Sequence, residues 1–433
     1  MRWFILKVKS LVNTEDKKRL LSNFISLFIL QGLNYLLPLI TLPYLVRILG
    51  VENFGLLAFV SVTIAYFSII TDYGFTLTAA REISIHKDKR EKVTEIFSAV
   101  ITIQFFLMLL SSLLLSVLVF SIERFRHDAI VYFFTFGLVI AQVLFPVWFF
   151  QGMEKMKYIT YINIGSKFFF TLMIFIFVQN ENDFYKVPLL TSIGNILAAL
   201  WALYIIKTKF SIRFQWQSID TLKHYQKEAH HIFVSNIAIS LYTVSTTFIL
   251  GLFTNNIVVG YFAAADKIIQ AFKGLMSPVF QTIYPYISQK AQQSKENGLH
   301  FIKKITFYII ITTGVISLFI FIFAEFLVNI ILGTGYQNSI IIVKILAFMP
   351  LVIGLSNMFG VQTMLNFGRK KAFSKILIVG SIINLLLSFL LVPLYQEIGS
   401  AISVLIVESF ITIAMFIYLQ KNELKIVGEM NRV

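Results

Sequence analysis

Long apolar stretches, separated by short polar segments, follow one another along almost the whole chain. A helix of about 20 apolar residues is long enough to cross the hydrocarbon core of a bilayer. Windows of this length predict twelve spans, near residues 24–46, 56–79, 97–120, 129–150, 158–178, 187–206, 232–252, 258–285, 304–325, 340–365, 373–393 and 399–420. The pattern therefore predicts an all-α polytopic membrane protein with about twelve transmembrane helices.

Lys and Arg gather in every second connection between these spans. With the N-terminus on the cytoplasmic side, 29 of the 37 Lys and Arg fall in inside segments, 4 in outside segments and 4 within spans. Cytoplasmic loops carry such an excess of positive charge. The charge pattern therefore predicts an even number of spans, with both termini in the cytoplasm.

The longest polar connection, residues 207–231, divides the spans into two sets of six. We therefore expect five parts: a basic cytoplasmic segment (1–22), an N-terminal six-helix bundle (23–206), a cytoplasmic linker (207–231), a C-terminal six-helix bundle (232–420) and a cytoplasmic tail (421–433). A faint repeat relates Leu49–Ala58, after the first span, to Thr254–Ala263, after the seventh. Two related halves of this kind predict a central cavity between the bundles.

The composition agrees with a membrane protein and excludes several other classes. Hydrophobic residues make up 57% of the 433 residues, charged residues 14%, and the mean hydropathy is +0.79. The net charge of +15 is spread over short loops, so we expect contact with anionic membrane lipid and no nucleic-acid partner. The chain has no cysteine and no Walker A or HExxH motif. We therefore expect no catalysis, no cofactor and no metal.

A few charged residues fall inside the predicted spans, and the eighth span is the most informative. At 100° per residue, Asp266, Gln270 and Lys273 lie on one face of that helix, and Lys267 points about 100° away from Asp266. A charge at the centre of a bilayer costs about 2.5–3.5 kcal/mol on insertion scales, so such residues should face a cavity or a partner. Asp266 can neutralise only one of the two lysines. We expect Lys267 and Lys273 to line a cavity.

Other spans carry polar stripes of the same kind. They contribute Asn34 in the first span, Asp72 in the second, Lys167 in the fifth, and Asn236 and Ser240 in the seventh, and the twelfth span carries the single charge of Glu408. These residues predict a hydrophilic chamber, although Ser, Thr and Asn stripes also bond neighbouring helices. Asp72 could instead bond a nearby loop, Glu408 could bind a coupling ion or pair with a polar neighbour, and Arg47 could anchor a helix end at the interface.

A chamber with unpaired cations suits a polar, bulky and anionic substrate. A phosphate or diphosphate head group can neutralise lysines that are otherwise costly to bury. The 45 Phe residues suit lipid contact and an oily tail lying between helices. Composition and placement therefore predict a transporter or flippase with an anion-tolerant cavity.

Several short motifs, in order along the chain, refine this prediction. They are Gln31–Pro38, Leu42–Gly50, Asn53–Gly55, Asp72–Phe75, Ala79–Ser84, Pro146–Gly152, Tyr261–Lys267 and Leu332–Tyr336. The ordered set resembles the bacterial polysaccharide flippases, the O-antigen or repeat-unit translocases of the multidrug/oligosaccharidyl-lipid/polysaccharide exporter superfamily. Each motif alone is loose, but together they cover essentially the whole chain.

This resemblance implies a V-shaped pair of six-helix bundles in the bacterial cytoplasmic membrane that opens alternately inward and outward. The implied substrate is an undecaprenyl-diphosphate-linked oligosaccharide, moved to the outer leaflet for polysaccharide or lipopolysaccharide biosynthesis, with other polysaccharide assembly proteins as further partners. Cavity cations contact the anionic substrate in such proteins. The positions that fit are Lys267, Lys273 and Lys167, with Arg47 as a weaker candidate.

Two other functions compete with this interpretation. An ion-coupled multidrug or toxin extruder of the same superfamily would use span carboxylates such as Asp72, Asp266 and Glu408 as its main charged feature, but lysines in the spans outnumber them 4 to 3. A membrane glycosyltransferase or polysaccharide polymerase would need an extramembrane catalytic surface with carboxylates, which the short loops do not offer.

Overall fold

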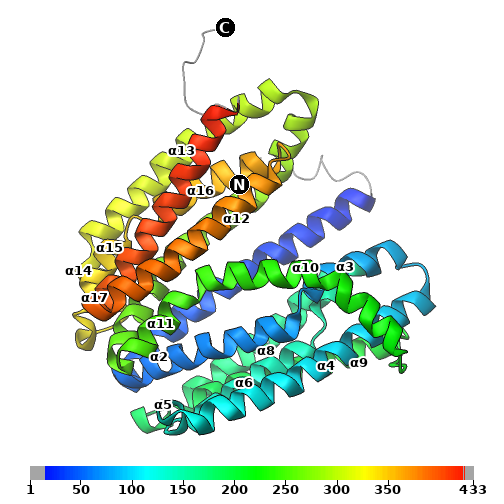
Figure 1. Cartoon of the computed structure of the whole chain (residues 1–433), viewed down its shortest axis with the longest axis horizontal. Helices are drawn as coiled ribbons and strands as arrows, with labels where there is room; N and C mark the ends of the chain where they lie inside the picture. The colour runs from blue at the N-terminus through cyan, green and yellow to red at the C-terminus, as the bar shows by residue number, and fades with distance from the viewer. Residues whose placement is uncertain (1–14, 423, 425–433) are drawn as a thin grey trace, which may run out of the picture. The chain divides into compact units, whose positions relative to one another are not determined.

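The computed structural model describes residues 15–422 and residue 424, and this part of the chain is almost entirely helical, with no strand (Figure 1). The first helices are α2 (Glu15–Asp72), α3 (Phe75–His86), α4 (Arg90–Ser121), α5 (Glu123–Arg126), α6 (Ala129–Leu144), α7 (Val147–Gly152), α8 (Met156–Phe177), η1 (Glu181–Asp183) and α9 (Lys186–Lys209). After a connection without regular structure come α10 (Ile219–Thr243), α11 (Ser245–Phe253), α12 (Asn256–Gln293), α13 (Lys295–Ile322), α14 (Ala324–Ile331), η2 (Thr334–Tyr336), α15 (Ser339–Leu346), α16 (Met349–Asn357), η3 (Met358–Leu365) and α17 (Lys370–Lys421).

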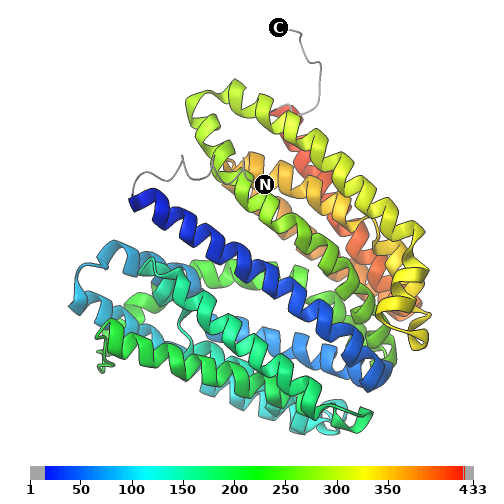
Figure 2. The same ribbon diagram turned by 180° about the vertical axis from the view of Figure 1, so that it is seen from behind.

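Two of the long helices are bent by single residues. Gly50 breaks α2 with φ 72°, a left-handed value that glycine adopts without strain. Figure 2 shows the blue helix near the N-terminus turning back on itself. Gln396 breaks α17 with φ 49°. A straight helix of 52 residues would be about 78 Å long, far more than one bilayer crossing needs. Each half of α17 is therefore long enough to be one span.

The helices match the predicted spans closely. Each predicted span has a helical counterpart, although several counterparts are divided by a bend or a short break, as in α6 with α7 and α15 with α16 and η3. Eight segments of the described residues are long and apolar enough to cross a membrane. Among them is Lys370–Lys421, which contains two predicted spans. The predicted fold class, an all-α polytopic membrane protein, is confirmed.

By its packing the chain divides into two compact units. Unit 1 comprises Met1–Pro38, Tyr66–Gln179 and Tyr185–Val234, and unit 2 comprises Leu39–Ala65, Asn180–Phe184 and Ser235–Val433. The segment around the bend at Gly50 therefore packs with the C-terminal half of the sequence. The predicted division at the polar linker puts residues 39–65 in the N-terminal bundle.

Unit 1 is built on an aromatic core. Trp148, Phe149 and Phe150 of α7 are buried against α3 and α4, with the rings of Phe97 and Phe149 meeting edge to face at 5.8 Å. Small residues let the helices approach closely. The hydroxyl of Ser192 in α9 donates to the carbonyl of Phe134 in α6 at 2.6 Å, where a side chain at Gly137 would clash.

Unit 2 has a separate core between α12, α13, α16, η3 and α17. Ile287, Met358, Met364 and Met415 are buried in it. The yellow to red helices of this unit lie side by side in both views (Figures 1 and 2). A buried hydrogen bond joins α11 to α17, because the amide of Asn384 donates to the hydroxyl of Thr246 at 3.2 Å.

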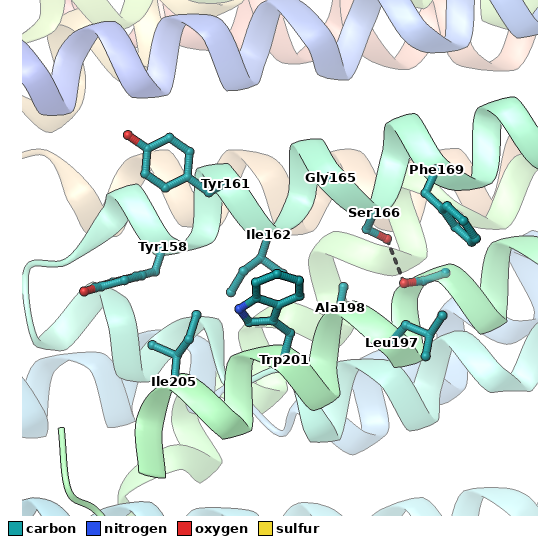
Figure 3. Close-up of a pocket in the computed structure, with 11 residues that line it drawn as sticks. Tyr158, Tyr161, Ile162, Gly165, Ser166, Phe169, Leu197, Ala198, Trp201 and Ile205 are labelled. Atoms are coloured by element: carbon teal, nitrogen blue, oxygen red, sulfur yellow. Dashed lines mark hydrogen bonds between the residues drawn. The ribbon is translucent and has the colours of Figure 1, made fainter. Parts of the chain in front are cut away.

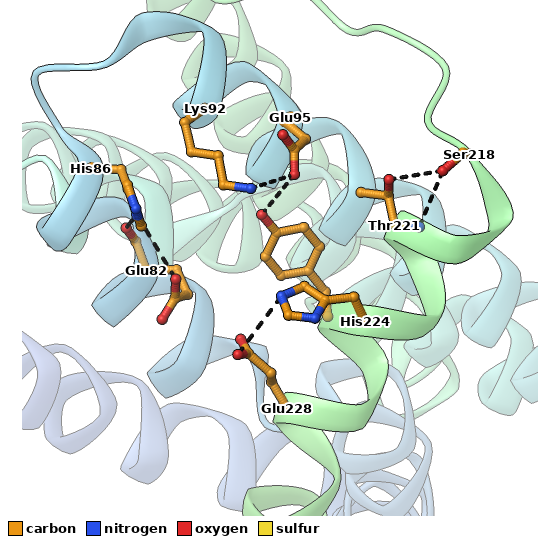
Figure 4. A network of polar contacts seen from close by, with 9 residues as sticks. Glu82, His86, Lys92, Glu95, Ser218, Thr221, His224 and Glu228 are labelled. Atoms are coloured by element: carbon orange, nitrogen blue, oxygen red, sulfur yellow. Dashed lines mark hydrogen bonds and ion pairs between the residues drawn. The ribbon is translucent and has the colours of Figure 1, made fainter.

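The second half of the predicted linker is a helix that packs into unit 1. Tyr225 of α10 is buried, and its hydroxyl donates to Glu95 of α4 at 3.1 Å, while Lys92 pairs with the same carboxylate at 2.7 Å (Figure 4). Burial raises the pKa of Tyr225 to about 12, so its hydroxyl stays protonated and able to donate at neutral pH. The start of α10 is thus attached to α4 through a cluster of polar contacts.

Replacing Tyr225 with Phe should destabilise this attachment by about 1.5–3 kcal/mol, since the substitution removes one hydrogen bond to a charged acceptor. Thermal unfolding of the purified protein in detergent would show a lower midpoint for Tyr225→Phe. The matched control is Tyr204→Phe, which removes a hydroxyl from a side chain that is 66% exposed. Equal midpoints for the two variants would contradict a stabilising role for the Tyr225 hydroxyl.

Candidate functional site

The polar face of α12 is the main candidate for a substrate site. The helix begins where the side chain of Asn255 accepts a hydrogen bond from the amide of Val258 at 3.0 Å. Further along, Asp266 is half-buried and accepts a hydrogen bond from the amide of Gln270 at 2.5 Å, one turn later on the same face. Gln270 and Lys267 are exposed, and Lys273 is half-buried. The predicted stripe therefore lies on an open face of its unit.

Lys267 and Lys273 form no ion pair with any residue whose side chain the structure describes. Asp266, the nearest candidate partner in sequence, is bonded to Gln270 instead. Polar residues also keep α12 out of the set of segments apolar enough to be candidate spans. A cation at membrane depth costs about 2.5–3.5 kcal/mol, so this face needs water or an anion beside it.

Beyond Lys273, α12 contains Pro278, and the turn after this proline is bonded to a neighbouring element. Gln362, from the π-helical turn η3, donates its amide to the carbonyl of Phe280 at 3.2 Å and to the side chain of Asn357 at 3.1 Å. Proline inside a helix removes a backbone donor and loosens the turn before it. Wide π turns of this kind are frequent at functional sites. The sequence analysis missed Gln362, because a π turn has no clear sequence signal.

The remaining predicted lining residues are scattered. Lys167 in α8 and Glu408 in α17 are half-buried, as is Asn236 in α10. Ser240 is buried, and its hydroxyl donates to the carbonyl of Ile237 at 2.7 Å, a bond within its own helix. The side chain of Asn34 lies outside the described part of the chain. Among the predicted residues whose side chains the structure describes, Asp266, Gln270 and Lys273 share one face of α12, and Lys267 lies on the adjoining face.

Asp72 has a local role at the junction of α2 and α3. Its carboxylate accepts hydrogen bonds from the backbone amide of Gly74 at 3.1 Å and from the hydroxyl of Thr76. Gly74, with φ 84°, precedes α3, and the carboxylate therefore bonds the free donors at the start of that helix. Next to it, the ring of Tyr73 stacks on Phe233 of α10 at 4.3 Å. Of the two interpretations, these contacts favour the local bond.

Two substitutions of Asp72 distinguish the local hydrogen-bonding role from a role of the carboxylate in transport. Asp72→Ala removes both hydrogen bonds and should destabilise the junction by about 1–2 kcal/mol. Asp72→Asn keeps one acceptor oxygen and should lose less, with transport retained. Thermal unfolding and transport would be measured for both variants. Transport abolished in Asp72→Asn, with stability unchanged, would instead assign the carboxylate to ion coupling.

Arg47 lies within α2, just before the bend at Gly50. Its guanidinium donates to the backbone carbonyl of Ile330 at the end of α14. Beside it, the hydroxyl of the buried Tyr336 donates to the carbonyl of Val46 at 3.3 Å. Arg47 thus bonds the end of a helix in the C-terminal half of the sequence. We name the pair of contacts from Arg47 and Tyr336 the Arg47 latch.

The two segments of the faint internal repeat also contact each other. A side chain at Gly55 would overlap the carbonyl oxygen of Asn256 and lie 2.6 Å from the amide of Gly260. A side chain at Gly260 would overlap the carbonyl of Val51 and lie 2.9 Å from its side chain. The repeat aligns Val51 with Asn256 and Gly55 with Gly260. The two contacts are therefore equivalent: Gly55 meets Asn256, and Gly260 meets Val51. We call this reciprocal contact the glycine crossing.

Nothing in the sequence pattern marked these glycines or Tyr336 as functional. The available signal was the repeat itself, which puts Gly55 and Gly260 at equivalent positions, and glycine lets two helices approach closely. Among the residues the structure describes, no cluster of His, Asp and Glu is arranged to hold a metal ion.

Comparisons with known proteins place this architecture in a family. Residues 20–291 match the polysaccharide biosynthesis protein family. A relative in Escherichia coli (strain K12) named "Putative O-antigen transporter" is 37% identical over 409 residues, covering 94% of this chain and 99% of its own. A relative of the same name in Shigella dysenteriae is 29% identical over 400 residues, covering 91% of this chain and 98% of its own.

Solved structures show the same fold at much lower identity. The lipid II flippase MurJ, in an inward closed conformation, aligns with a TM-score of 0.67 and 15% identity over 92% of this chain and 87% of its own. An inward-facing multidrug resistance MATE family transporter aligns with a TM-score of 0.66 and 13% identity, over 89% of this chain and 94% of its own. At these identities the likeness shows the fold alone.

Proposed function

Because this chain belongs to the polysaccharide biosynthesis protein family, as the resemblance in its motifs predicted, we propose that it is a flippase for lipid-linked glycans. Its substrate is an undecaprenyl-diphosphate-linked oligosaccharide repeat unit, used for O-antigen or other polysaccharide biosynthesis. The chain moves this unit across the bacterial cytoplasmic membrane, with both of its termini in the cytoplasm. The two six-helix halves enclose the route and open alternately to each side.

The observation that carries this proposal is the pair of lysines on adjoining faces of α12. Lys267 and Lys273 lack ion pairs in the described part of the chain, and a diphosphate supplies the negative charge that they need. Charge-assisted hydrogen bonds to phosphate are about twice as strong as neutral ones. Gln270 and Asp266, on the same face as Lys273, offer a donor and acceptors to sugar hydroxyls. The α12 helix thus offers partners to both parts of the head group.

The Arg47 latch and the glycine crossing hold residues 46–55 against the C-terminal half of the sequence, within unit 2. The charge pattern predicts that this end of the helices lies outside. Close approach of two backbones at glycine lets these segments pack tightly.

Reconstitution tests the function directly. The purified protein is placed in vesicles that contain an undecaprenyl-diphosphate oligosaccharide, and a membrane-impermeant sugar-modifying enzyme reports how much of the glycan reaches the opposite face. Transport above the level of protein-free vesicles is expected. No transfer of glycan, together with export of a cationic dye under an imposed sodium or proton gradient, would replace the proposal with a multidrug extruder. Other polysaccharide assembly proteins, absent from these vesicles, would supply and consume the substrate in the cell.

A further inference from the structure

A hollow between α8 and α9, within unit 1, has no part in the functional site described above. Its volume is about 730 Å³. Figure 3 shows side chains from two neighbouring helices projecting into it, among them Ile162 from α8 and Trp201 from α9. We call this hollow the α8–α9 groove.

The lining of the α8–α9 groove is apolar along its length. Small residues form part of it, and the hydroxyl of Ser166 is occupied because it donates to the carbonyl of Gly194 at 2.8 Å. Aromatic side chains border it, with Tyr161 68% exposed and Trp201 67% exposed. A side chain at Gly165 would meet no atom within 4 Å, so the space beside this residue is open. An occupant of this groove has to be a chain without polar groups.

The charge at one end of the groove is positive. Tyr158, near the start of α8, and Ile205, near the end of α9, both line the groove and mark this end. Exposed lysines stand there on both helices: Lys155, Lys157, Lys207 and Lys209. The ammonium group of Lys157 lies 5.5 Å from the ring centre of Tyr158. The groove therefore joins an apolar slot to a cationic mouth.

We propose that the α8–α9 groove holds the polyprenyl chain of the lipid-linked substrate while the diphosphate lies near the lysines at its mouth. This inference rests on the proposed function. A long apolar chain with an anionic head matches both the slot and the cationic mouth. The chain stays in the membrane while the head group crosses, so it needs a place against the protein on the lipid side of the route.

The hydrophobic effect does not select this occupant, because lipid tails are as apolar as the groove. Ordinary acyl chains can also enter it. The substrate is favoured by its diphosphate, which pairs with lysines at the mouth, and by the fit of its branched chain beside Gly165 and between the aromatic rings. Shape and packing are the forces that operate between apolar groups inside a bilayer.

Filling the groove tests the proposal. Gly165→Leu places a side chain in the open space, and the matched control, Gly314→Leu, adds the same side chain at a glycine of α13 that also has no neighbour within 4 Å. Both variants are reconstituted in vesicles with the same oligosaccharide diphosphate attached either to an undecaprenyl chain or to a short farnesyl chain. The Gly165→Leu variant should move the undecaprenyl substrate about 3- to 30-fold more slowly, the range expected for one or two packing contacts in a bilayer. It should move the farnesyl substrate at the rate of the unaltered protein.

The outcomes separate this proposal from the function it rests on. If the unaltered protein moves neither substrate, the flippase function itself fails. If it moves both, and Gly165→Leu slows both equally or slows neither, the groove does not hold the polyprenyl chain. In a second measurement, a photoreactive phenylalanine analogue at position 201 should crosslink to undecaprenyl diphosphate in vesicles of phosphatidylglycerol. Crosslinking to phosphatidylglycerol alone would assign the groove to bulk lipid and overturn the proposal.

Discussion

Replacing both Lys267 and Lys273 with alanine should lower glycan transport about 100-fold, and each single replacement should lower it about tenfold. A hydrogen bond to a charged group contributes about 1.5–3 kcal/mol, and each 1.4 kcal/mol corresponds to a factor of ten. Lys267 is exposed and Lys273 half-buried on adjoining faces of α12, and neither forms an ion pair among the described residues. The rate of glycan transfer in vesicles, and the polysaccharide on the cell surface, would measure the effect.

Two controls belong to this experiment. Lys267→Arg and Lys273→Arg keep the charge and should retain most of the transport, although a guanidinium differs from an ammonium in shape. Lys304→Ala removes an exposed lysine of α13, away from the α12 stripe, and should leave transport unchanged. All variants should insert in equal amounts, because no ion pair is lost. Normal transport by the double alanine variant would refute the anion-binding role of α12.

Adding a methyl group at the glycine crossing should separate two packed segments of unit 2. A Cβ at Gly55 or Gly260 meets backbone atoms, which cannot move aside by rotating a side chain. The two segments must therefore separate, at a cost of about 1–3 kcal/mol, which is the usual range for overpacking. Transport should fall about tenfold or more in Gly55→Ala and Gly260→Ala, since residues 51–55 then no longer pack against α12 as they do in unit 2.

The absence of cysteine makes this separation measurable. Val259 is fully buried beside Gly260, so a cysteine placed there should resist a membrane-impermeant thiol reagent added from outside. Combined with Gly55→Ala, the same cysteine should be labelled several times faster. Gly314→Ala is the matched control, because a side chain at that glycine meets nothing within 4 Å. Equal labelling in the Gly55 and Gly314 variants would show that the glycine crossing does not keep this part of unit 2 packed.

The predicted site was partly recoverable from the sequence. The 100° period of a helix was enough to place Asp266 and Gln270 on one face, and the hydrogen bond between them agrees. Sequence reasoning could not decide between a local bond and a substrate contact for Asp72, because that choice depends on the turn at Gly74. It also could not see that Arg47 reaches the carbonyl of Ile330, which lies 283 residues away.

Hydropathy and charge along the chain were sufficient for the fold class and the approximate spans, and ordered short motifs were sufficient for the family. These properties depend on the free energy of moving each segment into a bilayer, which is nearly additive over neighbouring residues. The pairing of Gly55 with Gly260, the position of residues 39–65 within unit 2 and the hollow between α8 and α9 required the folded chain. They depend on contacts between segments far apart in sequence, where the fit of one side chain against another backbone decides the geometry.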